Sequence, residues 1–266
     1  MNAKQITQIM LFFIAGLSIY PDASAQSSSD FKKIKSYHPG EQLRYIIRYG
    51  FIHGGEASTN LRLVNYEGKV LFHARILAQS TGLADKLFSV TDIYESYFDR
   101  NTCLPHKAIR NIKEGNYRYY NEVYYKHEEN TLYSQRSDSI FHVPENILDM
   151  VSTLYYIRSI DLAKLNKGDA IEVITFFGDE IFPFKIRYSG KEEIKTKFGR
   201  MICFRFDPVV EVGRIFKTED DMTLWISDDQ NLLPILIKFD MLVGSIKFEL
   251  DGFTNLKYEL NTVTRK

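Results

Sequence analysis

The sequence predicts a mainly β protein: a single curved antiparallel sheet that forms an open or closed barrel-like fold with one packed amphipathic helix. Three observations support this prediction. Apolar and polar residues alternate in most segments of the chain, which is the period of a strand with one buried face. Turn-forming residues recur roughly every 10 to 15 residues. One helical pattern divides the strands into two runs, and no Gly/Ser-rich or Pro-rich linker separates these runs.

The clearest strand pair lies in the range 40–63. Its first half alternates large apolar residues with a face that carries Arg44 and Arg48, and its second half resumes the alternation. Between the halves, Gly54 and Gly55 supply the backbone freedom for a reversal. Because an isolated hairpin is not stable in water, we expect the rest of the chain to cover its apolar face.

Further strands follow from the same alternation. They are expected at 70–79, 91–100, 107–112, 117–125, 132–136, 170–177, 181–188, 201–206, 222–226, 233–239, 244–250 and 255–260. A short helical turn is expected within 81–88, because Leu83 and Leu87 are four residues apart. The chain therefore reads as an antiparallel meander on both sides of one longer helix.

That helix is expected to begin at Pro144 and Glu145, since proline is tolerated in a first helical turn and a carboxylate is favourable there. Its apolar stripe consists of Ile147, Met150, Val151, Leu154 and Tyr155. We expect the helix to cap or plug the sheet.

Residues 1–25 have the pattern of an export signal. Lys4 gives a short positive region, the range 9–19 is an apolar core, and Ala23-Ser24-Ala25 is a small-x-small cleavage site. We expect cleavage between Ala25 and Gln26 and a periplasmic or otherwise exported product. The apolar run is too short to span the roughly 30 Å of a bilayer's hydrocarbon core.

The mature chain is predicted to contain a loose polar leader at 26–38 and a single mainly-β domain at 39–262. No later stretch approaches the roughly 20 apolar residues of a membrane helix, so no transmembrane segment is expected in the mature chain. The formal net charge is zero, which gives no electrostatic reason to expect nucleic acid or an anionic membrane as a partner.

Two cysteines, Cys103 and Cys203, would meet in an oxidising compartment after export. A disulfide between them would close a loop of about 100 residues and contribute at most about 4–5 kcal/mol in the chain-entropy model. The alternative is two free thiols that pack as small apolar groups. Spacing alone leaves both open.

The sequence contains no recognisable catalytic, cofactor-binding or metal-binding motif. There is no Gly-x-Ser-x-Gly elbow and no His-Glu-x-x-His helix, and the six histidines are scattered singly. We therefore predict no catalytic residue, no cofactor and no metal, and we favour a protein that is not an enzyme. A carboxylate pair for glycoside cleavage stays open, because the separation of such a pair depends on the fold.

The aromatic content is high, with 17 Tyr and 19 Phe, and suits sheet surfaces. A curved antiparallel sheet closed on one side by a helix has the shape of proteins that hold apolar ligands. We expect such a cavity to be lined from the strand 117–125 and the helix. The predicted lining residues are Tyr117, Tyr119, Tyr125, Met150, Leu154 and Tyr155. For any one of them, simple core packing is the commoner role.

Several motifs occur in order along the chain. They are Gly40-Glu41-x-Leu43 with Gly54-Gly55-Glu56-Ala57, the stretch Leu148–Tyr156, Phe198-Gly199 leading to Phe206-x-Pro208, and Leu224–Asp229 with Leu233-Pro234. Together they cover nearly all of the mature chain and resemble the domain of unknown function 3108 family. The resemblance implies a bacterial envelope protein, and the cleavage region Ala23-Ser24-Ala25-Gln26 resembles those of the Bacteroidetes. The family resemblance implies no activity and no catalytic residue.

Our first functional hypothesis is a non-enzymatic binding or carrier module for an apolar or envelope-derived ligand, such as a lipid or glycolipid. The second is an envelope assembly protein that recruits a partner protein through exposed strand edges. The third is a hydrolase of envelope polymers. A ligand that copurifies would favour the first, an uncovered strand edge the second, and a close carboxylate pair facing an open cleft the third.

Overall fold

The structure, a computed structural model, describes residues 36–208, 222–240 and 244–263. The expected export signal at 1–25 lies outside these ranges, as does most of the expected leader. At the end of that leader, Ser36 and Tyr37 are buried rather than loose. Tyr37 packs edge-on against the ring of Tyr155, so the chain is already part of the core at this point.

The described chain consists mainly of strands. They are β1 (Gln42–Tyr49), β2 (Ile52–Tyr66), β3 (Lys69–Ser80), β4 (Val90–Phe98), β5 (Pro105–Glu114), β6 (Tyr117–Lys126), β7 (Thr131–Ser134), β8 (Ser139–His142), β9 (Ala170–Phe177), β10 (Glu180–Thr196), β11 (Gly199–Pro208), β12 (Met222–Ser227), β13 (Pro234–Asp240) and β14 (Ser245–Thr254). The helices are α2 (Gly82–Leu87) and α3 (Met150–Ile157), with 3-10 turns η2 (His127–Glu129) and η3 (Leu162–Lys164).

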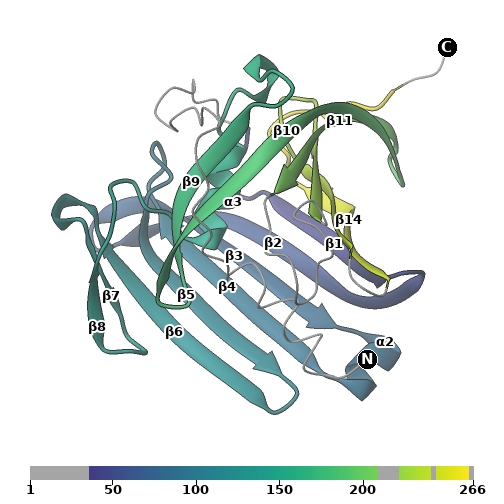
Figure 1. The fold of residues 1–266 in the computed structure, drawn as a ribbon. Helices are drawn as coiled ribbons and strands as arrows, with labels where there is room; N and C mark the ends of the chain where they lie inside the picture. The colour runs from purple at the N-terminus through teal and green to yellow at the C-terminus, as the bar shows by residue number, and fades with distance from the viewer. Residues whose placement is uncertain (1–35, 209–221, 241–243, 264–266) are drawn as a thin grey trace.

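The strands form one antiparallel sheet in the order β8-β7-β6-β5-β4-β3-β2-β1-β14-β13-β12-β11-β10-β9. Strands β1 to β8 follow one another outward, and β9 to β14 return so that the last strand pairs with the first. The sheet curls until β9 and β10 pass across the face of β3–β5, with α3 between the two layers (Figure 1). The predicted curved sheet is therefore confirmed, in its open form, with β8 and β9 at the edges.

The segment that precedes α3 covers the backbone edge of β9. The backbone N–H of Leu148 donates to Ile174 O at 2.9 Å, and the N–H of Phe176 donates to Leu148 O at 2.9 Å. These bonds form a short parallel bridge to β9. The edge of β9 is thus paired with a connecting segment and not with another strand.

The helix α3 begins at Met150, not at Pro144 as the periodicity predicted. Asn146 has a left-handed φ of 59°, which breaks any helix that starts earlier. Asp149 then caps the helix, because its carboxylate accepts from the backbone N–H groups of Val151 and Ser152. The Ser152 hydroxyl accepts from the N–H of Asp149 and completes a capping box.

The first hairpin reverses earlier than predicted. Gly50, with φ of 57°, lies in the turn, whereas Gly54 and Gly55 lie inside β2. Gly55 is needed there for a different reason: a Cβ atom on it would lie 2.4 Å from the carbonyl oxygen of Gln79 on β3. The glycine pair permits close strand packing and does not make the turn.

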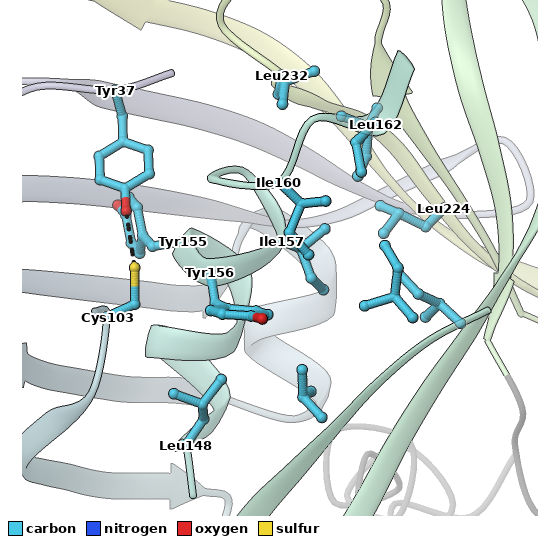
Figure 2. Packing of buried hydrophobic residues seen from close by; sticks show 14 of the residues in the cluster. Tyr37, Cys103, Leu148, Tyr155, Tyr156, Ile157, Ile160, Leu162, Leu224 and Leu232 are labelled. Carbon is cyan, nitrogen blue, oxygen red and sulfur yellow. Dashed lines mark hydrogen bonds between the residues drawn. The ribbon is translucent and has the colours of Figure 1, made fainter. Parts of the chain in front are cut away.

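The main hydrophobic core surrounds α3. Figure 2 shows its helical residues Tyr155, Tyr156 and Ile157 between Cys103 on one side and Leu224 on the other. A second cluster lies on the opposite face of β11 and β12, around Trp225. The tail 255–260, predicted as a strand, is irregular. The Asn231 amide donates to the carbonyls of Tyr258 and Glu259, which fixes the tail beside this cluster.

The two cysteines belong to different clusters and are free thiols. The sulfur of Cys103 lies 3.3 Å from the hydroxyl of Tyr37 in the main core (Figure 2). Cys203 faces the second cluster, with its sulfur 3.9 Å from the carbonyl of Met201. The sequence left open a disulfide or two packed thiols, and in the structure each cysteine is a separately packed free thiol.

Candidate functional site

A cavity of about 50 Å³ lies between the inner face of β4–β6 and the N-terminal end of α3. The three neighbouring strands β4, β5 and β6 contribute residues to one side of the cavity, and the end of β9 borders it as well. The lining residues are Tyr94, Glu95, Ala108, Ile109, Arg110, Tyr119, Asn121, Val123, Tyr125, Asp149, Met150, Val151, Phe176, Phe177 and Gly178. The walls are therefore mainly aromatic and aliphatic, with a few polar groups.

Three of the six predicted lining residues, Tyr119, Tyr125 and Met150, are at this cavity. The other three lie elsewhere. Tyr117 is 41% exposed at the outer end of β6. Tyr155 is fully buried in the main core against Phe98, on a later turn of α3. Leu154 is partly buried and does not border the cavity.

The Arg110 side chain dominates the chemistry of the cavity. Its guanidinium carbon lies 4.2 Å from the ring centroid of Phe177 and 4.5 Å from that of Tyr119. Such contacts hold a cation on aromatic faces without neutralising its charge. The Nε atom of Arg110 is buried and has no hydrogen-bond partner among the residues that the structure describes. Arg110 thus contributes a cation to the wall of the cavity, and its buried Nε is a donor without a partner.

The position of Arg110 follows from strand alternation. Ala108, Arg110 and Ile112 share the inner face of β5, and Arg110 pairs with Tyr94 on β4 and with Asn121 on β6. Our sequence reading did not single out this arginine. A signal was available, because Arg110 stands between Ala108 and Ile112, two apolar residues of the same strand face.

A second polar group at the cavity is the hydroxyl of Tyr125. The tyrosine is buried, and within the described ranges its hydroxyl has no hydrogen-bond partner. Burial raises the pKa of this phenol, and the nearby Asp149 carboxyl raises it further. The hydroxyl therefore stays protonated and keeps a hydrogen-bond donor without a partner beside the cavity.

The Asp149 carboxyl is already occupied by structural bonds. One oxygen accepts from two backbone N–H groups of α3, and the other accepts from the Ser96 hydroxyl at 2.5 Å. Burial raises the pKa of Asp149, and these hydrogen bonds oppose the rise. Its position is explained by capping, so we assign it no chemical role.

A pair of acidic side chains lies on neighbouring strands. Asp92 and Glu114 interact with each other, and both are buried, at 0% and 2% exposed. Neither lines the cavity. The pair therefore does not face an open cleft, and it gives no support to the hydrolase hypothesis. Among the described residues, no group of His, Cys, Asp and Glu could hold a metal ion.

The fold and the cavity define a class: a mainly-β protein with one open, barrel-like sheet wrapped around a central helix. A family model described as "Protein of unknown function (DUF3108)" matches residues 44–251. The chain therefore belongs to this family. No curated protein matches it. No helix in the described part of the chain is both long and apolar enough to cross a membrane.

Two solved structures resemble the chain. One is a beta-barrel-like protein of the domain of unknown function DUF1849 from Brucella abortus, at a TM-score of 0.52 and 6% identity, covering 83% of this chain and 98% of that one. The other is a DUF1089 family protein from Pseudomonas aeruginosa, at a TM-score of 0.38 and 9% identity, covering 67% of this chain and 87% of that one. The similarity to the first structure concerns the fold alone. The similarity to the second is too weak to show a shared fold.

Proposed function

We propose that this protein is a non-enzymatic binding module whose ligand places a small anionic group beside Arg110. The observation that carries the proposal is the buried, unpartnered Nε of a guanidinium held between the rings of Phe177 and Tyr119. A carboxylate or phosphate satisfies such a donor with a charge-assisted hydrogen bond. The Tyr125 hydroxyl supplies a second donor.

The size of the cavity limits what enters it. Its volume of about 50 Å³ is far below the roughly 300–1,000 Å³ of pockets that enclose a whole drug-sized ligand. In our proposal the cavity therefore receives the head of an amphiphile, and the apolar part lies against the aromatic residues at its border. Phe176, Phe177 and Tyr119 are the rings available for that contact. A lipid or an envelope-derived glycolipid fits this description.

Export is part of the same proposal. Cleavage between Ala25 and Gln26 places the mature chain in the periplasm or outside the cell, where envelope lipids are accessible. The Bacteroidetes origin implied by the sequence motifs stays a prediction.

The test uses decanoate and its uncharged analogue decanol as probes. Replacing Arg110 by Met is expected to weaken decanoate binding by about tenfold or more, the value of a hydrogen bond to a charged group. Decanol binding is expected to change little. The matched control is Arg100→Met, which alters an exposed arginine after β4. Equal decanoate affinity in both variants would refute the role of Arg110. Mass spectrometry of solvent extracts would identify any copurified ligand.

One observation favours the second hypothesis, recruitment of a partner protein by an exposed strand edge. The edge strand β8 carries Ile140, which is 70% exposed. Lysine at this position blocks edge pairing. Ile140→Lys is expected to abolish capture of a partner that adds a strand to β8, and to leave decanoate binding unchanged.

A further inference from the structure

One end of the sheet carries a rim of three adjacent turns. The rim consists of the β1–β2 turn at 50–52, the α2 segment at 81–89 and the β5–β6 turn at 113–118. Hydrogen bonds tie the α2 segment to its neighbours: Thr81 N donates to Gly54 O of β2 at 3.1 Å, and Gly115 N of the β5–β6 turn donates to Ser89 O at 2.7 Å. The three turns follow one another along the same margin of the curved sheet (Figure 1).

Large apolar side chains of this rim point into solvent. Phe51 is 91% exposed, Leu83 is 73% exposed and Leu87 is 79% exposed. Helix α2 has no buried residue, so its two leucines, four residues apart, form a ridge that packs on nothing. Single exposed apolar residues are common, but several of them on adjoining turns indicate an interaction site.

The charge of the rim differs from that of the whole chain. Lys86 on the α2 segment and Lys113 and Arg118 on the β5–β6 turn are exposed, and Asp85 is the exposed acidic residue beside them. Glu114, the other carboxylate of these turns, is buried. The overall neutrality that argued against an anionic membrane thus conceals a local excess of positive charge next to the exposed leucines and phenylalanine.

We propose that this rim docks on the anionic surface of a lipid bilayer. Phe51, Leu83 and Leu87 enter the boundary between headgroups and acyl chains, and the basic residues lie at the lipid phosphates. The chemistry favours a bilayer over a protein, because exposed apolar side chains and basic side chains share the same rim, the combination that suits an anionic lipid interface. A specific protein partner needs a shaped surface of roughly 1,000 Å² or more. The proposal is independent of the cavity and of its ligand.

The first experiment is flotation of the purified protein with vesicles. Vesicles of phosphatidylcholine alone are compared with vesicles of equal parts phosphatidylcholine and phosphatidylglycerol. Binding to the mixed vesicles is expected, weakening as salt is raised. The double variant Leu83→Ser and Leu87→Ser is expected to lose about tenfold or more in affinity, because both side chains leave the bilayer. The matched control is Ile140→Ser, which removes a similarly exposed apolar residue from the edge strand β8.

A second readout follows the insertion itself. The chain has one tryptophan, Trp225, which is buried. A Phe51→Trp variant therefore adds one exposed fluorophore at the rim, whose emission is expected to shift to the blue when mixed vesicles are added. These substitutions lie at exposed positions, so far-ultraviolet circular dichroism should show an unchanged fold.

Other outcomes would overturn the proposal. One is absence of binding to the mixed vesicles. Another is an equal loss in Ile140→Ser and in the leucine variant. A third is self-association that the leucine variant abolishes while vesicles have no effect, which would assign the rim to a second copy of this chain.

Discussion

Glu41 and Arg158 form a fully buried, two-pronged ion pair, with Nη1 to Oε1 at 2.6 Å and Nη2 to Oε2 at 2.8 Å. Glu41 precedes β1, and Arg158 is the residue at the C-terminal end of α3. The same guanidinium also donates to the carbonyls of Leu232 and Asn231, at 3.1 Å each. One side chain thus ties the central helix to both halves of the sheet.

Breaking this pair from one side is expected to be costly. In Glu41→Gln the Arg158 charge stays buried without its anion, so we expect a loss of about 3–5 kcal/mol in the free energy of unfolding. The double variant Glu41→Leu with Arg158→Met should cost less than Glu41→Gln alone, because no buried charge remains. Urea unfolding measures both.

The matched control for that experiment is the exposed pair of Lys126 and Glu129, with Nζ 3.3 Å from Oε1. Glu129→Gln is expected to cost less than about 1 kcal/mol, because water screens a surface ion pair. If the double variant Glu41→Leu with Arg158→Met lost as much as the sum of these two substitutions made singly, the two buried charges would not be coupled.

Local pattern was sufficient to predict most strands, because alternation reports which face of each strand is buried. It did not locate the start of α3. Residues from Ile147 onward have helical spacing, yet the segment at Leu148 is extended and bonded to β9. The sequence cannot show this competition, since β9 lies more than twenty residues later in the chain.

The candidate site was predicted only in part, because it too depends on contacts between residues far apart in the chain. Tyr125 and Tyr155 are both aromatic, on elements that were assigned correctly, but Tyr125 borders the cavity and Tyr155 fills the core. Whether an aromatic side chain borders the cavity or fills the core depends on how α3 is placed over the sheet. That placement is set by the distant contact of Arg158 with Glu41, which no local pattern reveals.

The glycine pair in β2 offers a direct test of close strand packing. Alanine at Gly55 would bring its Cβ to 2.4 Å from Gln79 O, so β3 must move, and we expect a loss of about 1–3 kcal/mol. Alanine at Gly54 would lie 3.8 Å from its nearest neighbour, Ile47 O, and should change stability by less than about 0.5 kcal/mol. Thermal unfolding compares the two. Equal losses would show that the pair acts through backbone flexibility.

The free thiols predict a specific chemical behaviour. Burial raises the pKa of the Cys203 thiol to about 12, so little reactive thiolate forms at neutral pH. Without reductant, we expect the folded protein to react slowly with a thiol reagent such as dithionitrobenzoate. After unfolding, both Cys103 and Cys203 should react. Recovery of no free thiol after unfolding would mean that a bridge forms between them.

Asp92 gives the chain a pH dependence of known sign. Burial raises the pKa of this carboxyl from 3.8 to about 6, although the Lys113 N–H and the Glu114 side chain oppose the rise. Between these two pH values the folded state binds more protons at Asp92 than the unfolded state. The contribution of Asp92 to stability therefore falls as pH rises from about 4 to about 6, by about 2–3 kcal/mol.

The variant Asp92→Asn isolates that contribution, because an amide oxygen can still accept from Lys113 N. We expect the variant to be more stable than the natural chain at pH 7, and this advantage to vanish near pH 4. Asp85→Asn should behave oppositely, because the hydroxyls of Ser80 and Ser89 lower the pKa of the exposed Asp85 carboxyl. The Asp85→Asn variant is therefore expected to be less stable than the natural chain above that pKa, where the natural carboxylate is ionised. Urea unfolding at several pH values measures both, and a gain that is constant from pH 4 to pH 7 would show that Asp92 is not the titrating group.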